Sequence, residues 1–216
     1  MALTILVEPH PLLEVGAFVM RLPQALAAVP TPAAVTDLTR PGAVAPIAPS
    51  EAVKAAVRDL LRHGGYKPSG RSKPASEYLV GAVLEGRFPA INAAVDACNV
   101  VSLHSGLPIS LVDIDRVAGA LTVRIAPAGT SYVFNPSGQV IDAAGLICLF
   151  DAEGPTGTPV KDAQRTKTHD GTRAALALVW GTRALGDRAR DTTAWYRRLV
   201  GTIEGAVVED VALASA

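Results

Sequence analysis

The stretch INAAVDACNVVSLHSGLPISLVDID, from Ile91 to Asp115, carries the most informative pattern of the 216-residue chain. It predicts a helix over residues 91–104, because a glycine and a proline follow shortly afterwards. On that helix Asn92, Asp96 and Asn99 fall within about 60° of one another, and apolar side chains surround them. A helix that is apolar on nearly every side is normally buried. The three polar side chains therefore need partners.

Two kinds of partner are open for this polar stripe. Leaving a buried polar group without a hydrogen bond costs about 1–3 kcal/mol, so such groups are almost always paired. The commoner arrangement is structural, in which the asparagines and the aspartate hold irregular loops next to the helix. The other is a ligand that faces the stripe, and the two arrangements are compatible.

Towards the N-terminus, the runs LTILV and LEVGAFVMRL predict two strands. Six prolines between Pro23 and Pro49 predict a loop without helix, because proline lacks a donor and favours extended geometry before it. Ser50 is a suitable N-cap for a helix that stops at Gly64 and Gly65. A second helix is expected from Pro74 to about residue 86, with an inner face made of Ala75, Leu79, Ala82 and Val83.

Towards the C-terminus the pattern is mostly that of β-structure. Strands are predicted at ALTVRIA, TSYVF, GQVIDAA and LICLF, and the apolar run over 174–181 favours a further strand. A helix over 187–204 and a closing strand at VVEDVAL complete the chain. We therefore expect one α+β domain over residues 1–216. Its parts are the strands and Pro-rich loop of 1–48, a core over 49–183, and a helix and strand over 184–216.

The composition excludes several classes of protein. Hydrophobic residues make up 49% of the chain, 20 basic side chains balance 20 acidic ones, and no apolar run approaches the roughly 20 residues of a membrane span. The N-terminus lacks the basic start of a secretory signal, so we expect a soluble, cytoplasmic protein. Cys98 and Cys148 are the only cysteines, and the four histidines are scattered. We expect neither a disulfide nor a metal site nor a cofactor.

The helix stretch and its continuation to Ala126 resemble a known family. They follow the pattern I-N-x-x-V-D-x-x-N-x-x-x-L-x-x-G-x-P-x-x-x-x-D-x-D-x-I-x-G in the editing domain of the bacterial phenylalanyl-tRNA synthetase β subunit. The later run QRTKTHDGTRAALALVW resembles a threonine-rich strand region of that domain, so the resemblance covers roughly residues 66–183. The matching positions are Ile91, Asn92, Val95, Asp96, Asn99, Leu103, Gly106, Pro108, Asp113, Asp115 and Gly119.

The resemblance implies an α+β fold with β-sandwich-like sheets and flanking helices, and an editing-domain-like core over 49–183. In the synthetase this domain hydrolyses the ester of tyrosine wrongly attached to phenylalanine tRNA. The chain has no room for a synthetase catalytic core, so it is similar to free-standing proteins built from this domain alone. Ester hydrolysis needs a positioned water, a proton acceptor and donors for the developing oxyanion.

The resemblance also implies a set of pocket residues. Cys98 and Asn99 match pocket-lining positions, the pocket histidine of the family falls at Ser110, and its glutamate falls at Gln164. Both ionisable groups would then be neutral here, which lowers the expectation of the family's reaction on tyrosine and favours a binding module or another specificity. The expected substrate-binding residues are Asn92, Asp96, Cys98, Asn99, Ser110, Gln164 and Arg165, and no catalytic residue is assigned.

Basic side chains concentrate over residues 54–73. Like charges four residues apart on a helix repel, and a phosphate partner would offset that repulsion. The alternative is an ordinary solvated helix face with local acidic partners. The residues expected to bind RNA are Arg58, Arg62, Lys67, Arg71 and Lys73.

Two functions are open at this stage. The first is an RNA- or aminoacyl-tRNA-binding protein, with or without the ability to hydrolyse mischarged aminoacyl-tRNA in trans. The second is a non-enzymatic protein that binds a small molecule such as an amino acid, having kept the cavity without tRNA binding. The net charge of zero and the 5% aromatic content favour the second, because readers of single-stranded RNA usually stack bases on aromatic side chains. Neither DNA nor a membrane is expected as a partner.

Overall fold

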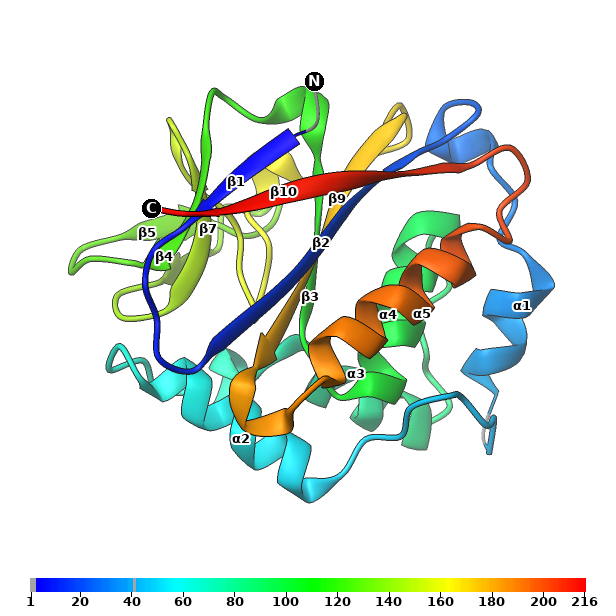
Figure 1. The fold of residues 1–216 in the computed structure, drawn as a ribbon. Coiled ribbons are helices and arrows are strands. Elements are labelled where there is room, and N and C mark those ends of the chain that lie inside the picture. The colour runs from blue at the N-terminus through cyan, green and yellow to red at the C-terminus, as the bar shows by residue number, and fades with distance from the viewer. Residues whose placement is uncertain (1–2, 41) are drawn as a thin grey trace.

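The computed structural model describes residues 3–40 and 42–216; Met1, Ala2 and Pro41, which belong to the expected N-terminal part, lie outside the described residues. Strands and helices mix along the chain, as an α+β fold requires (Figure 1). The strands are β1 (Leu3–Val7), β2 (Leu13–Arg21), β3 (Ile109–Asp113), β4 (Leu121–Ile125), β5 (Ser131–Val133), β6 (Val140–Asp142), β7 (Ile147–Asp151), β8 (Gly154–Gly157), β9 (Ala174–Thr182) and β10 (Val207–Ser215). The helices are α1 (Ala33–Thr36), α2 (Glu51–Arg62), α3 (Ala75–Leu84), α4 (Ala93–Ser105) and α5 (Arg188–Val200).

One eight-stranded sheet, in the order β3-β9-β2-β10-β1-β4-β7-β8, organises the fold. Its two halves share β10. Residues Val207 to Asp210 pair antiparallel with β2, and Val211 to Ser215 pair parallel with β1. A separate hairpin joins β5 to β6. The strand that closes the chain therefore links the two halves of a sandwich-like sheet, and the α+β class expected from the sequence is confirmed.

The outermost strands of this sheet, β3 and β8, come close to each other. The hydroxyl of Ser110 on β3 donates a hydrogen bond to the carbonyl of Thr158, just after β8, at 3.1 Å. A Cβ on Gly157 would lie 3.0 Å from the Cβ of Ser110, so a larger residue there would require the two strands to shift apart by a few tenths of an ångström. Val112 of β3 also forms an isolated antiparallel bridge with Lys167. We call this contact of β3 with β8 and the following loop the seam.

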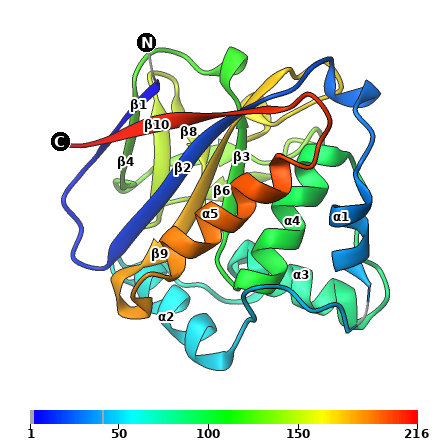
Figure 2. The same cartoon turned by 45° about the vertical axis from the view of Figure 1, so that its right-hand side comes forward.

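The helices gather on one side of the strands (Figures 1 and 2). The stretch that opens the sequence analysis forms α4, whose N-cap Asn92 accepts a hydrogen bond from the backbone N–H of Val95 at 2.9 Å. Gly106 ends α4 in the left-handed conformation with φ 70°. Ten of the thirteen residues of α4 are buried, which agrees with its apolar pattern. No helix within the described residues is long and apolar enough to cross a membrane.

Several elements differ from the sequence-based expectations. The Pro-rich segment contains the short helix α1, which begins directly after Pro32, where proline is tolerated. The expected inner face of α3 is only partly buried, because this helix lies over hollows rather than against the core. Strands β3 and β8 had not been predicted, and α5 ends at Val200 rather than at residue 204. Strand β8 has the sequence GPTG and shows no alternation, and β3 is only five residues long and buried on both faces, so neither carries a recognisable period.

A single added methyl group tests how closely α5 packs on the sheet. In β9, a Cβ on Gly181 would lie 2.4 Å from the Cβ of Ala189 in α5 and 3.0 Å from the carbonyl of Glu14. We expect Gly181→Ala to lower the free energy of unfolding by about 1–3 kcal/mol, measured by urea denaturation. The matched control is Gly81→Ala in α3, where a Cβ meets nothing within 4 Å and alanine is the better helix former. An unchanged midpoint of urea denaturation for Gly181→Ala would contradict the close packing of α5 on β9.

Candidate functional site

A cleft of about 350 Å³ opens beside the seam, between the N-terminal half of α4, β3 and the loop after β8. This volume lies at the small end of the range for ligand pockets, about 300–1,000 Å³. Its wall combines apolar side chains with a few polar groups, as small-molecule sites usually do. The lining residues are Ala75, Ile91, Asn92, Val95, Cys98, Asn99, Ile109, Leu111, Thr158, Val160, Lys161, Asp162, Lys167 and Thr168.

Asp162 provides the carboxylate of the cleft. One oxygen accepts the backbone N–H of Leu111 in β3 at 2.9 Å, and the other accepts the backbone N–H of Thr158 at 3.0 Å. Burial raises the pKa of Asp162 to about 6, and the nearby hydroxyl of Ser110 and the backbone N–H groups of Leu111 and Thr158 act in the opposite direction. A carboxylate of this kind changes its charge near neutral pH and can accept a proton there.

The loop that carries Asp162 is held by its own hydrogen bonds. The hydroxyl of Thr158 accepts the backbone N–H groups of Val160 at 3.2 Å and Lys161 at 3.0 Å. The hydroxyl of Tyr132 in β5 donates to the carbonyl of Lys161 at 2.5 Å. The backbone from Thr158 to Lys161 is thus fixed, and its own two hydrogen bonds fix the carboxylate of Asp162.

Three residues predicted for the site line the cleft together. Asn92 caps α4 and also contributes to the wall, while Asn99 lies about two turns further along. Cys98 is buried, its thiol lies 4.0 Å from the carbonyl of Ile109, and burial raises the pKa of the thiol to about 12. A thiol with so high a pKa is a poor nucleophile, so Cys98 contributes shape rather than reactivity.

Asp96 and Ser110 lie near the cleft but are absent from its lining, because the protein itself pairs them. Asp96 accepts the hydroxyl of Thr31 at 3.1 Å and the backbone N–H of Ile91 at 2.8 Å, so it ties the Pro-rich segment to α4. Ser110 is fully buried in the seam, where its hydroxyl accepts a hydrogen bond from the indole N–H of Trp180 at 2.9 Å. For these two residues the structure favours the structural alternative.

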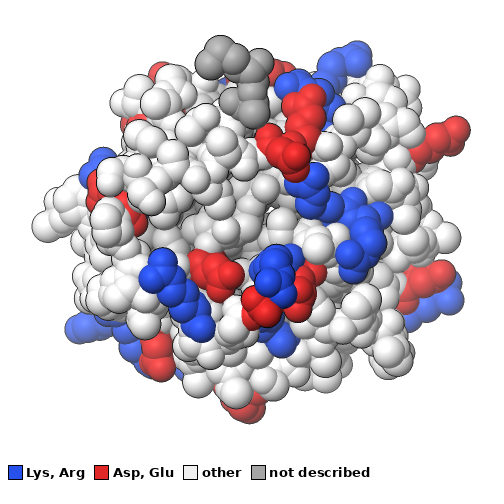
Figure 3. All heavy atoms as spheres, in the orientation of Figure 1, with Lys and Arg blue, Asp and Glu red and all other residues white. Residues whose placement is uncertain are grey.

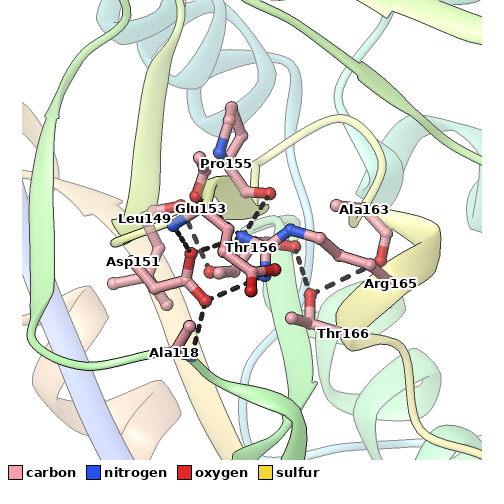
Figure 4. A network of polar contacts seen from close by, with 10 residues as sticks. Ala118, Leu149, Asp151, Glu153, Pro155, Thr156, Ala163, Arg165 and Thr166 are labelled. Atoms are coloured by element: carbon pink, nitrogen blue, oxygen red, sulfur yellow. Dashed lines mark hydrogen bonds and ion pairs between the residues drawn. The ribbon is translucent and has the colours of Figure 1, made fainter.

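Gln164 and Arg165 lie on a short 3-10 helix, Gln164–Thr166, beyond the cleft lining. Arg165 forms a bidentate ion pair with Asp151, at 2.9 and 2.5 Å, and Asp151 also accepts the backbone N–H groups of Ala118 and Glu153 (Figure 4). The paired guanidinium lowers the pKa of Asp151 against the effect of burial. Arg165 therefore connects β7 and β8 to the loop that carries the cleft residues.

The five basic residues expected to bind RNA are dispersed. Arg58 is held by Glu77 of α3 in two hydrogen bonds of 2.7 and 2.6 Å, and Arg62 pairs with Asp59 at 2.8 Å. Lys67 and Arg71 are exposed, and Lys73 lines a separate hollow of about 570 Å³ between α2 and α3. On the face of the molecule in Figure 3, acidic and basic side chains are interspersed. The helix α2 thus has local acidic partners for two of its cations.

Asp162, Lys161 and Lys167 were not among the site residues expected from the sequence. The resemblance placed the family's glutamate at Gln164, two residues after Asp162. The neighbouring residues Lys161 and Ala163 give no periodic pattern that would point to Asp162 instead. The carboxylate of Asp162 is placed by hydrogen bonds from the backbone of two segments distant in sequence, and no local sequence motif predicts these contacts.

Comparisons with known proteins agree with this architecture. The model of a protein family described as the B3/4 domain matches residues 69–184, which is more than half of the chain and includes every residue of the cleft. The chain belongs to the B3/4 domain family. The family assignment supports the resemblance to the phenylalanyl-tRNA synthetase β subunit, because the same segment carries it.

This B3/4 protein is similar to two proteins that are β subunits of that synthetase by name. It is 31% identical over 96 residues to the phenylalanine–tRNA ligase β subunit of Cutibacterium acnes, covering 40% of this chain and 11% of that subunit. A solved N-terminal fragment of the phenylalanyl-tRNA synthetase β subunit from Pyrococcus horikoshii has a TM-score of 0.49 and 9% identity, covering 98% of this chain and 52% of that one. The chain thus spans about a tenth of the first relative and about half of the second.

The high pKa of the Cys98 thiol predicts slow chemical labelling. At pH 8 we expect Ellman's reagent to react with Cys98 of the folded protein at least about 100-fold more slowly than after denaturation, because so little thiolate is present. A Cys148→Ala variant removes the other buried cysteine and makes the signal specific. Rapid labelling of the folded variant would contradict the assignment and return Cys98 to the candidates for a nucleophile.

Proposed function

We propose that the cleft binds the aminoacyl group at the 3′ end of a mischarged tRNA, and that the protein hydrolyses the ester in trans. The observation that carries this proposal is the carboxylate of Asp162 in the cleft of a B3/4 domain. It is partly buried, it has a pKa of about 6, and Asn99 and Thr168 lie on the same lining. The relatives described above are phenylalanyl-tRNA synthetase β subunits, which favours a tRNA-related substrate.

The chemistry needs one proton acceptor and donors for an oxyanion. The carboxylate of Asp162 accepts a proton from water as the water oxygen attacks the ester carbonyl carbon. The carbon–oxygen bond to the ribose then breaks, the ribose oxygen takes up the proton, and the amino acid leaves as its carboxylic acid. The amide of Asn99 and the ammonium of Lys167 are donors on the cleft wall that can stabilise the developing negative charge.

The amino acid recognised differs from that of the synthetase in this proposal. The family's histidine falls at Ser110, which is buried in the seam and is no proton acceptor at neutral pH. The cleft wall includes the apolar side chains of Ile109 and Leu111, and its volume is about 350 Å³. The apolar wall favours an amino acid with an apolar side chain over tyrosine, whose phenolic hydroxyl needs a hydrogen-bond partner.

Replacing the carboxylate tests the reaction. We expect Asp162→Asn to lower the rate of hydrolysis of mischarged tRNA by at least about 100-fold, the usual contribution of a positioned proton acceptor. In the unaltered protein the rate should rise with pH through about 6 and then level off, because only the ionised carboxylate accepts a proton. This inflection should disappear in the variant, measured between pH 5 and 7.5 with a panel of mischarged tRNAs.

The matched control is Asp170→Asn, an exposed carboxylate in the segment that follows the cleft loop. Its rate and pH profile should equal those of the unaltered protein. Because Asp162 also accepts two backbone N–H groups, urea denaturation of Asp162→Asn must accompany the assay. A folded Asp162→Asn protein with an unchanged rate would exclude the carboxylate as the proton acceptor.

A second candidate function is the binding of an amino acid without tRNA. The ion pairs of Arg58 and Arg62 and the net charge of zero favour it, because an RNA site needs cations that are available to phosphate. In that case the carboxylate of Asp162 would hold the α-ammonium group. Calorimetric titration with single amino acids separates the two functions, since the binder saturates with the amino acid alone and shows no affinity for tRNA at low salt.

A further inference from the structure

The rim of the cleft carries two lysines stacked on one aromatic ring. The ammonium of Lys167 lies 3.8 Å from the centroid of Phe134 and donates to the carbonyl of Phe134 at 2.6 Å. The ammonium of Lys161 lies 4.6 Å from the same ring and 6.0 Å from the ring of Tyr78 in α3. We call Tyr78, Phe134, Lys161 and Lys167 the ledge.

The ledge places two positive charges together without an acidic partner for them. Within residues 3–40 and 42–216 neither lysine forms an ion pair, and the carboxylate of Asp162 already accepts two backbone N–H groups. Burial lowers the pKa of Lys167, with Lys161 acting in the same direction and Asp162 in the opposite one. The mutual repulsion of two ammonium groups is relieved when an anion binds between them.

The ledge also continues into a second hollow. This hollow, of about 390 Å³, shares Ala75, Asn99, Val160 and Lys161 with the cleft and adds Tyr78 and Leu79. Tyr78 is 41% exposed, and its hydroxyl donates to the carbonyl of Gly70 at 3.0 Å, which fixes the ring. A fixed and accessible aromatic ring next to the ammonium of Lys161 is the arrangement that binds a base together with its phosphate.

We infer that the ledge is a subsite for the terminal nucleotides of a single-stranded RNA 3′ end, with the phosphate held by Lys161 and Lys167 and a base stacked on Tyr78. This inference rests on the proposed function and deepens it, because the ledge adjoins the cleft that takes the aminoacyl group. Stacking and phosphate contacts read no base sequence. The site would therefore recognise the common end of many RNAs, and the cleft alone would select the amino acid.

The test uses a short RNA, cytidine-cytidine-adenosine with a 3′ hydroxyl and a 5′ fluorophore, and the full chain. We expect Lys161→Met to weaken binding about five-fold or more and to reduce the salt dependence of the affinity by about 0.7 in logarithmic slope, as for one lost phosphate contact. Tyr78→Leu should weaken binding about five-fold or more through the lost stacking. Both are measured by fluorescence anisotropy from 20 to roughly 200 mM salt, a range in which phosphate contacts dominate the affinity.

Two control variants match these changes. Tyr78→Phe keeps the ring and loses only the hydrogen bond to Gly70, and Arg190→Gln removes an exposed cation of α5 far from the ledge in sequence. Both should bind the RNA within about two-fold of the unaltered protein, a change too small for a lost stacked base. Lys161→Met should fold normally, since the hydrogen bonds of that residue come from its backbone. The inference would be overturned if Lys161→Met and Tyr78→Leu bound the RNA as tightly as the unaltered protein, or if the unaltered protein did not bind the RNA at low salt.

An amino acid ethyl ester separates this inference from the proposed function. The ester has no nucleotide, so its hydrolysis reports on Asp162 alone. If Asp162→Asn loses ester hydrolysis and Lys161→Met binds the RNA as the unaltered protein does, the proposed function is supported and the RNA subsite at the ledge is excluded. If RNA binding depends on the ledge residues but the protein hydrolyses no ester, the RNA subsite is supported and the proposed catalysis is excluded.

Discussion

The carboxylate of Asp162 joins the two edges of the large sheet. Strands β3 and β8 are the outermost strands of an order in which six others lie between them, yet Asp162 accepts one backbone N–H from β3 and one from the residue after β8. An uncovered strand edge presents unpaired backbone groups, and this side chain pairs one of them. The seam, the cleft beside it and the loop that carries Lys161 all depend on this connection.

The same connection sets the chemistry of the carboxylate. Burial in the seam raises the pKa of Asp162, while the N–H groups that it accepts stabilise the charged form and limit the shift to a value of about 6. Since the pKa of Asp162 in the folded protein exceeds the ordinary value of 3.8, its contribution to stability is present at low pH and is lost as the pH rises through about 6. At neutral pH the group is therefore ionised at some cost, which is a property expected of a proton acceptor.

Much of the fold could be predicted from local periodicity. The helical spacing of Val53, Val57, Leu60 and Leu61 located α2, and these side chains are all buried. The apolar run of β9 was assigned correctly as a strand, with every residue buried. Strand β8 was not predicted, because its sequence GPTG has neither alternation nor branched side chains, and it forms only because β7 and the seam surround it. In that segment tertiary contacts override local preference.

The candidate site was less accessible to sequence reasoning, and the reason is physical. Asp96 and Asn99 lie on one helix as predicted, whereas Asn92 precedes it as the N-cap in an extended conformation. A helical wheel cannot distinguish a side chain that faces a loop from one that faces a cleft. Asp96 faces Thr31, sixty-five residues away along the chain, whereas Asn99 lies on the cleft wall. The ledge is still less visible, because Phe134 and Lys161 meet only after the β5–β6 hairpin and the loop after β8 have folded against each other.

A single basic surface would both attract nucleic acid in general and hold one end of it. The arrangement of charges around the cleft separates these two tasks. A broad positive face attracts any nucleic acid, and its affinity falls steeply as salt rises. Here Arg58 and Arg62 are engaged with carboxylates, and the cations of the ledge lie directly beside the cleft. A partner would then be held at its end rather than along its length. Such a site discriminates by what is attached to that end, which is the requirement for a protein that examines an aminoacyl group.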